Sequence, residues 1–116
     1  MTDMTSDEVK RGAMKLGRAL PGTMGAFHRL HAAALADGEL TASTKELIAM
    51  AISVATGCGG CIAYHGERAL EAGATKEQYL EAVGVAVLMG GGPASVYGAR
   101  AAELLETAVG GSERIA

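Results

Sequence analysis

The sequence is poor in large side chains, with no tryptophan, one phenylalanine and three tyrosines among its 116 residues. Small residues take their place, because the chain contains about 23 alanines and 17 glycines. Alanine favours helix, and the shortage of β-branched and aromatic runs argues against a sheet protein. Small side chains let helices approach closely but bury little apolar area each, so one copy would have a thin core. We therefore expect an all-α protein, one domain over residues 1–116, that forms a homo-oligomer.

An excess of charge of one sign is also absent. The chain has 10 Lys and Arg residues against 13 Asp and Glu residues, for a net charge of -3. Without a basic block to neutralise phosphates, and with four aromatic side chains for base stacking, nucleic acid is excluded as a partner. The stretch 1–11 is acidic and polar, where a signal peptide would be basic and then apolar, so we expect a cytoplasmic protein.

Two stretches of 18 residues, 47–64 and 82–99, carry no charge and have the length of a membrane span. Glycines interrupt both, so the uninterrupted helical pieces are too short to cross a bilayer. A helix that is apolar all round is then expected inside a bundle or at a subunit interface. The sequence predicts no membrane insertion.

Start and stop signals divide the chain into about six helices. Three residue pairs have the spacing of a capping box, which marks a helix start: Thr5 with Glu8, Ser43 with Glu46, and Thr75 with Gln78. Pro21 and Pro93 fit the first turns of two more helices, and another begins around Cys58. Helix ends are predicted at Asp37-Gly38, Gly57, Ala72-Gly73, the triple glycine 90–92 and Gly110-Gly111.

The two cysteines of the chain stand together as Cys58-Gly59-Gly60-Cys61, and His65 follows four residues later. Near the start of a helix, free amide groups and the helix dipole stabilise a thiolate, the species that attacks. Cysteines three residues apart can also close a small disulfide ring. His65 lies one further turn along on the Cys61 face, where its imidazole could accept the thiol proton. The spacing favours redox chemistry.

Other interpretations of the cysteines stay open. A structural disulfide is disfavoured in the cytoplasm, and so short a ring constrains the unfolded chain little. Zinc needs about four ligands, of which the motif supplies three, so His28 or His31 would have to complete the set. Covalent haem attachment is excluded because Ile62, not histidine, follows the second cysteine. Two inert buried thiols remain the simplest alternative.

Several other polar residues have two interpretations. Glu46 is explained by its capping box with Ser43, but the same helix could carry a buried carboxylate back toward the cysteines. Ser53, on the same helix face, could extend a polar track, although a packing role is favoured. His28 and His31 are expected to be core or rim residues without a catalytic role. Tyr64 is assigned to packing or an interface.

The spacing resembles the alkyl hydroperoxidase D (AhpD) group of the carboxymuconolactone decarboxylase superfamily. In that pattern a glutamate stands twelve residues before a C-x-x-C pair, and a histidine stands four residues after its second cysteine. Here these residues are Glu46, Cys58, Cys61 and His65. The resemblance covers about residues 21–106 and includes the G-G-G-P break and the alanine-rich last helix.

The resemblance implies a helical fold assembled as a trimer or a dimer of trimers, with the cysteine pair near a subunit interface. It implies that Cys61 attacks a small organic hydroperoxide, that Cys58 then closes a disulfide, and that Glu46 and His65 relay protons. A dithiol donor, in the family a lipoyl or thioredoxin-like protein, would reduce the disulfide. No cofactor or metal is implied. The sequence departs from the best-studied relay at Gly60, where that relay has a histidine.

The sequence therefore supports a thiol-dependent alkyl hydroperoxidase as the first hypothesis. A lactone enzyme like carboxymuconolactone decarboxylase is the nearest enzymatic alternative. The cysteine pair argues against it, because the resemblance implies that decarboxylase members work without such a pair. A non-catalytic stress protein that senses redox state or holds zinc is an alternative of a different class.

Overall fold

The computed structural model describes residues 5–108, and within them it contains six α-helices and no strand. The helices are α1 (Ser6–Ala19), α2 (Pro21–Leu35), α3 (Ala42–Thr56), α4 (Gly59–Glu71), α5 (Lys76–Gly90) and α6 (Gly92–Ala108). The all-α prediction and its six helices are confirmed. The end predicted at Gly110-Gly111 lies outside the described residues.

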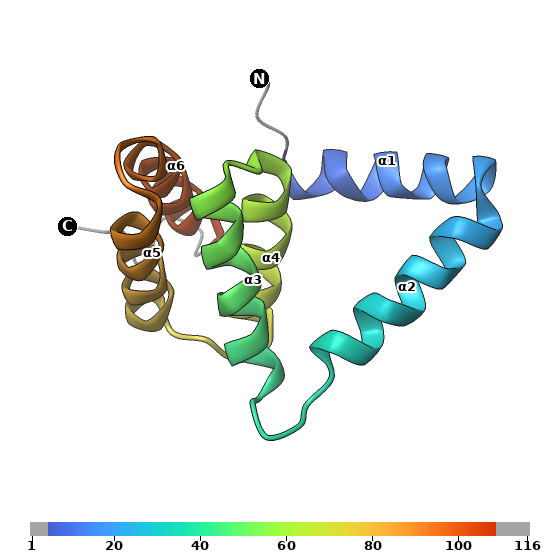
Figure 1. Cartoon of the computed structure of the whole chain (residues 1–116), viewed down its shortest axis with the longest axis horizontal. Helices are drawn as coiled ribbons and strands as arrows, with labels where there is room; N and C mark the ends of the chain where they lie inside the picture. The colour runs from blue at the N-terminus through green and yellow to red at the C-terminus, as the bar shows by residue number, and fades with distance from the viewer. Residues whose placement is uncertain (1–4, 109–116) are drawn as a thin grey trace.

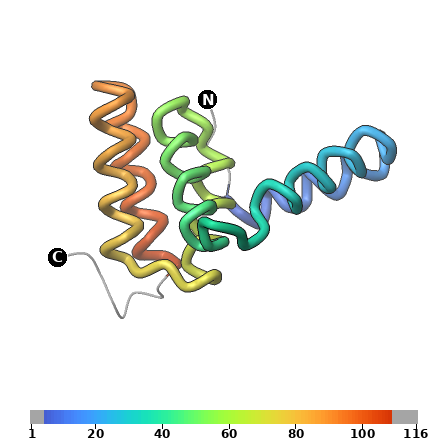
Figure 2. The backbone as a smooth tube through the Cα atoms, turned by 60° about the horizontal axis from the view of Figure 1, so that its bottom comes forward, coloured from blue at the N-terminus to red at the C-terminus, as the bar shows by residue number. Residues whose placement is uncertain are grey.

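The helices form two parts that differ in packing. Helices α3 to α6 make a bundle, and α1 and α2 project from one side of it as an arm (Figure 1). Helix α1 leads away from α4 and α2 returns toward the start of α3, so the two helices meet at the tip of the arm and diverge toward the bundle in Figure 1, although they overlap in the view of Figure 2. We use "arm" for α1 and α2 together, and "bundle" for the other four helices.

Local signals in the sequence set most helix boundaries. The capping boxes at Thr5 and Thr75 both form, each with the reciprocal pair of hydrogen bonds. Pro21 occupies the first turn of α2, as predicted. The triple glycine separates α5 from α6 at Gly91, so α6 begins one residue before Pro93.

The core lies within the bundle and is built around α3. Its fully buried side chains include Met50 and Val54 from α3 and Ile62 from α4. Tyr79 on α5 is also buried, and its hydroxyl donates a hydrogen bond of 2.7 Å to the Ala101 carbonyl on α6. Burial raises the pKa of Tyr79 above its ordinary value. The phenol is therefore a neutral donor that ties α5 to α6.

Small residues bring the bundle helices close together. A Cβ atom at Gly98 would lie 3.1 Å from side-chain carbons of both Val83 and Val87 on α5. Such a contact is tighter than ordinary van der Waals packing, so glycine lets α6 rest against α5. The alanine and glycine content thus serves close helix packing, as the composition predicted.

The arm is attached through polar contacts near its start. The Ser6 hydroxyl and the Lys10 ammonium both donate to Glu67 Oε1 on α4, each over 3.2 Å. In contrast, α2 contains no buried residue. No helix within residues 5–108 is long and apolar enough to cross a membrane.

Candidate active site

The site begins where the chain turns from α3 into α4. Gly57 ends α3 with φ 78°, a left-handed conformation that glycine adopts without strain. The backbone amides of Gly57 and Cys58 then both donate to the Ser53 carbonyl over 2.9 Å. This turn fixes Cys58 at the first position before α4.

Cys58 and Cys61 form a disulfide across the first turn of α4. Cys58 is the N-cap residue, and its sulfur accepts a hydrogen bond of 3.3 Å from the Cys61 amide. The two Cα atoms are 5.3 Å apart, a separation that suits a disulfide, and both residues are half-buried. The structure therefore shows the oxidised form of the pair, at the end of a helix where a thiolate would be stabilised.

One turn further along α4, His65 pairs with Glu46 of α3. His65 Nδ1 lies 2.6 Å from Glu46 Oε1, and the two side chains are 17% and 5% exposed. A carboxylate has no proton to donate, so Nδ1–H is the donor, and Nε2 is left free for a second partner. Burial strengthens this charge-assisted bond. The arrangement is that of a base whose tautomer and orientation are set by a carboxylate.

The predicted capping box between Ser43 and Glu46 is wrong. The N-cap of α3 is Thr41, whose hydroxyl accepts a hydrogen bond of 3.2 Å from the Thr44 amide. Asp37 adds to this start by accepting from the Ala42 amide over 2.7 Å. Because the helix begins two residues earlier than the box required, Glu46 lies beyond its first turn and is directed to His65.

Arg68 supplies positive charge at the edge of the pair. Its Nε atom lies 4.0 Å from Glu46 Oε2 and 3.9 Å from Glu71 Oε1, and its side chain is about half exposed. The guanidinium carbon also lies 5.9 Å from the centre of the Tyr64 ring. Glu46 is thus bonded on one oxygen and has a longer ionic contact on the other.

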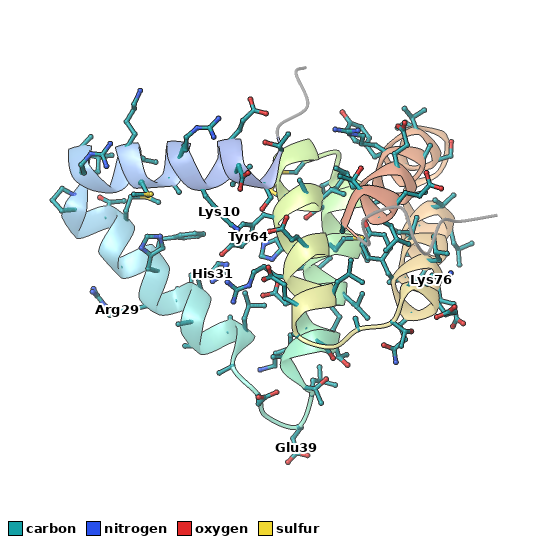
Figure 3. All side chains as sticks on the ribbon, turned by 180° about the vertical axis from the view of Figure 1, so that it is seen from behind. Lys10, Arg29, His31, Glu39, Tyr64 and Lys76 are labelled. Atoms are coloured by element: carbon teal, nitrogen blue, oxygen red, sulfur yellow. A yellow bond between two sulfur atoms is a disulfide. The ribbon has the colours of Figure 1, made fainter. Side chains whose placement is uncertain are left out.

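Two aromatic side chains complete the surroundings of His65, and neither was expected to have a catalytic role. The His31 ring of α2 stacks on His65 at 5.7 Å between centres, and Tyr64 meets His65 edge-on at 5.0 Å. His31 and Tyr64 are themselves 5.9 Å apart (Figure 3). Figure 3 also shows both rings in the space between α2 and α4, whereas Arg29 points away from it.

A pocket of about 340 Å3 opens beside the carboxylate of the pair. Its polar lining comes from His31, Glu46, Tyr64 and Arg68, and alanines and Leu35 supply the apolar part. Burial, followed by the neighbouring His65, lowers the pKa of His31. The pocket therefore reaches the Glu46 carboxylate of the pair, beside the neutral imidazole of His31.

The remaining candidates from the sequence are not brought into this group. Ser53 is buried, but its hydroxyl donates over 2.7 Å to the Ala49 carbonyl of its own helix, which supports a packing role. His28 is exposed and contacts the Phe27 ring. Within the described part of the chain, no three His, Cys, Asp or Glu side chains are grouped as metal ligands would be.

The sequence and the fold both match known proteins of one family. The sequence pattern of the carboxymuconolactone decarboxylase family matches residues 21–104, which is most of the chain. The chain belongs to the carboxymuconolactone decarboxylase family. This confirms the resemblance on which the interpretation of Glu46, Cys58, Cys61 and His65 was based.

Solved structures of carboxymuconolactone decarboxylase family proteins have the same fold. The apo form of one from Legionella pneumophila superposes with a TM-score of 0.83 at 42% identity, over 88% of this chain and 91% of that one. Another, from Thermotoga maritima, has a TM-score of 0.77 at 30% identity, over 88% and 87% of the two chains. Involvement in an antioxidative response has been suggested for the Thermotoga protein.

Curated relatives share much of the sequence but carry no assigned function. An uncharacterized protein of Cupriavidus necator is 43% identical over 81% of this chain and 83% of its own length. An uncharacterized protein of Paracoccus denitrificans, numbered 4 in the cox locus, is 35% identical over 91% and 96% of the two chains. The comparisons thus establish the carboxymuconolactone decarboxylase family and leave the reaction to be argued from the site.

The Glu46–His65 bond predicts a specific pattern of stability. His65→Ala leaves a buried carboxylate without its donor, so the free energy of unfolding should fall by about 2–4 kcal/mol. The double variant Glu46→Leu with His65→Ala removes the buried charge as well and should recover part of that loss. Urea denaturation of the disulfide-intact proteins measures both.

His28→Ala is the matched control, because His28 is exposed and makes no contact with Glu46. Its effect should stay within about 0.5 kcal/mol. Equal losses in His65→Ala and His28→Ala would contradict the importance of the buried pair.

Proposed function

We propose that this chain is a thiol-dependent peroxidase that reduces small organic hydroperoxides through Cys58 and Cys61. The observation that carries the proposal is the hydrogen-bonded Glu46–His65 pair, located one helical turn from a cysteine pair that closes a disulfide. A proton acceptor and the positive end of a helix both favour the conversion of a thiol to a thiolate, and α4 supplies both. The suggested antioxidative role of the Thermotoga relative is in keeping with this chemistry.

In the proposed reaction, Cys61 is the attacking residue. His65 lies four residues after Cys61 and hence on the same face of α4, so its free Nε2 is the group suited to accept the thiol proton. The buried Glu46 carboxylate then stabilises the imidazolium that forms. The thiolate attacks a peroxide oxygen, a sulfur–oxygen bond forms, the oxygen–oxygen bond breaks, and the alkoxide leaves as an alcohol with the relayed proton.

Cys58 completes the oxidation and a second protein restores the thiols. The Cys58 sulfur attacks the sulfenic acid on Cys61, forming the disulfide and releasing water. A dithiol donor, of lipoyl or thioredoxin type, reduces the disulfide by exchange and becomes oxidised itself. We place the protein in the cytoplasm, where such donors keep thiols reduced.

The cysteines should have different roles when tested separately. Reduced wild-type protein should lose both titratable thiols on adding cumene hydroperoxide and should release one cumyl alcohol per disulfide. Cys61→Ser should consume no peroxide, and Cys58→Ser should stop at a sulfenic acid that dimedone traps. Thiol titration and mass spectrometry measure these outcomes, with alkylated wild-type protein as the control.

Other results of the same experiment would overturn the peroxidase proposal. The proposal is contradicted directly if both thiols stay titratable in excess hydroperoxide. Turnover of a lactone that survives Cys61→Ser would favour the decarboxylase-like enzyme, and stoichiometric zinc in the purified protein would favour a metal-binding stress protein.

We also propose that the working form is a homo-oligomer, a trimer or a dimer of trimers. Large apolar side chains are exposed on the arm and on the bundle: Met14, Leu16, Leu20, Phe27 and Leu30 on the arm, and Ile48, Ile52, Val85, Leu88, Met89 and Val96 on the bundle. Exposure on this scale is typical of surfaces that other chains cover. The arm of one copy packed on a neighbour would explain why α2 buries nothing within its own chain.

An interface charge tests this assembly. Leu88 is 78% exposed and lies on α5, a helix that contributes no residue to the site. Leu88→Glu should therefore yield a smaller particle by light scattering and a lower peroxidase activity per subunit. Glu77→Gln, on the same helix but outside the apolar group, should change neither. A dissociated variant with unchanged activity per subunit would count against the link between assembly and activity.

A further inference from the structure

One side chain of α2 reaches the Glu46–His65 pair, although the helix has no buried residue. The His31 ring lies parallel to the His65 ring, with 20° between their planes and 5.7 Å between their centres. His31 also contacts Phe27 of its own helix, with 6.1 Å between the ring centres. His31 therefore links the arm to the candidate proton relay on the bundle.

We infer that His31 is a positioning residue for His65: its stacked ring holds the His65 imidazole in the orientation that directs Nδ1 to Glu46. His31 is not assigned any contact with peroxide or with sulfur. The kinetic part of this inference rests on the proposed function, whereas the geometric part concerns the His65 ring alone.

The contacts around His65 show why a stacking partner is needed. The torsion that rotates an imidazole about its Cβ–Cγ bond has broad minima, so the backbone of α4 does not fix the ring plane. Glu46 holds the ring at one nitrogen, and Tyr64 meets it edge-on with an interplanar angle of 87°. Among the described ring contacts of His65, only the one with His31 is stacked, whereas the one with Tyr64 is perpendicular.

The pocket beside Glu46 would let water reach this face of His65 if the His31 ring were absent. His31 and Glu46 both line the pocket, so removal of the His31 ring would extend the pocket to the face of His65. Water entering there would compete for the Glu46 carboxylate and would weaken a bond that owes its strength to burial. The ring thus excludes water as well as fixing the plane.

The charges around His31 determine when it can stack. Its charged or titratable neighbours are His28 on α2, Glu46 on α3, and Tyr64, His65 and Arg68 on α4. Burial lowers the pKa of His31, His65 and Arg68 act in the same direction, and Glu46 opposes them. A neutral His31 can lie against the imidazolium that forms on His65 when it takes a proton. A protonated His31 would place two positive rings face to face.

Three variants separate the ring from its charge and from the arm. His31→Ala removes the ring, His31→Phe keeps a flat ring without a titratable group, and His28→Ala removes the neighbouring imidazole that does not contact His65. Because α2 has no buried residue, all three should fold, and thermal melts by circular dichroism check this.

The first measurement needs no peroxidase activity and uses the oxidised protein. Proton NMR should show the Nδ1–H of His65 as a slowly exchanging signal in wild-type protein, in His31→Phe and in His28→Ala. In His31→Ala the exchange with water should be at least about tenfold faster. Unchanged exchange in His31→Ala would overturn the inference, as would equal acceleration in His28→Ala or no rescue by His31→Phe.

The second measurement follows the rate of thiol oxidation by cumene hydroperoxide in the reduced proteins. His31→Ala should be about tenfold slower than wild type at neutral pH, and His31→Phe should be close to wild type. Between about pH 7 and pH 5 the rate for His31→Phe should fall less steeply than for wild type, because no second positive ring forms. Identical pH profiles would contradict the charge argument. If wild-type protein consumes no peroxide, the proposed function fails and the NMR result still decides the role of His31.

Discussion

The structure of the site depends on one buried hydrogen bond, between Glu46 of α3 and His65 of α4. It joins the two helices that position the four residues predicted for the site. His65 follows the disulfide-bonded Cys61 by one turn of α4. A carboxylate that is 5% exposed is stable only with a partner, so the bond constrains how α3 and α4 are placed relative to each other. The same bond fixes the imidazole tautomer. One contact therefore both holds α3 against α4 and orients the imidazole for proton transfer.

The small-residue composition is what makes this contact possible. Small residues let the bundle helices approach closely, and Gly57 provides a left-handed turn that brings Cys58 to the start of α4 two residues after α3 ends at Thr56. The price of this composition is a thin core and many exposed apolar side chains, on the arm and on the bundle alike. In our account, assembly of several chains covers these apolar side chains. The arm also contacts the Glu46–His65 pair of the bundle through His31.

Sequence reasoning predicted the elements whose signals are local. Thr5 and Thr75 cap helices through residues three positions away, and the C-x-x-C spacing already places the cysteines across one turn. Glu46 shows where local signals mislead, because its distance from Ser43 fits a capping box although Thr41 is the true N-cap. The family resemblance, not the spacing alone, assigned Glu46 to the relay, and the fold places its carboxylate on His65.

His31 shows what the sequence could not supply. The spacing of His31 with Phe27 and Leu35 predicts an apolar helix face, but the sequence does not indicate that this face packs against α4. The contact between His31 and His65 joins residues 34 positions apart and depends on the angle at which the arm leaves the bundle. Contacts of this kind depend on the tertiary structure, so local sequence patterns do not predict them.

The central claim is that Glu46, acting through His65, activates the cysteine pair. The most direct test is stopped-flow measurement of disulfide formation when reduced Glu46→Gln protein meets excess organic hydroperoxide. Glutamine keeps the size of the side chain and can still accept from Nδ1–H, but it has no charge to stabilise an imidazolium. Our account predicts disulfide formation about a hundredfold slower than in wild type. Disulfide formation at the wild-type rate, with the wild-type dependence on pH, would contradict it.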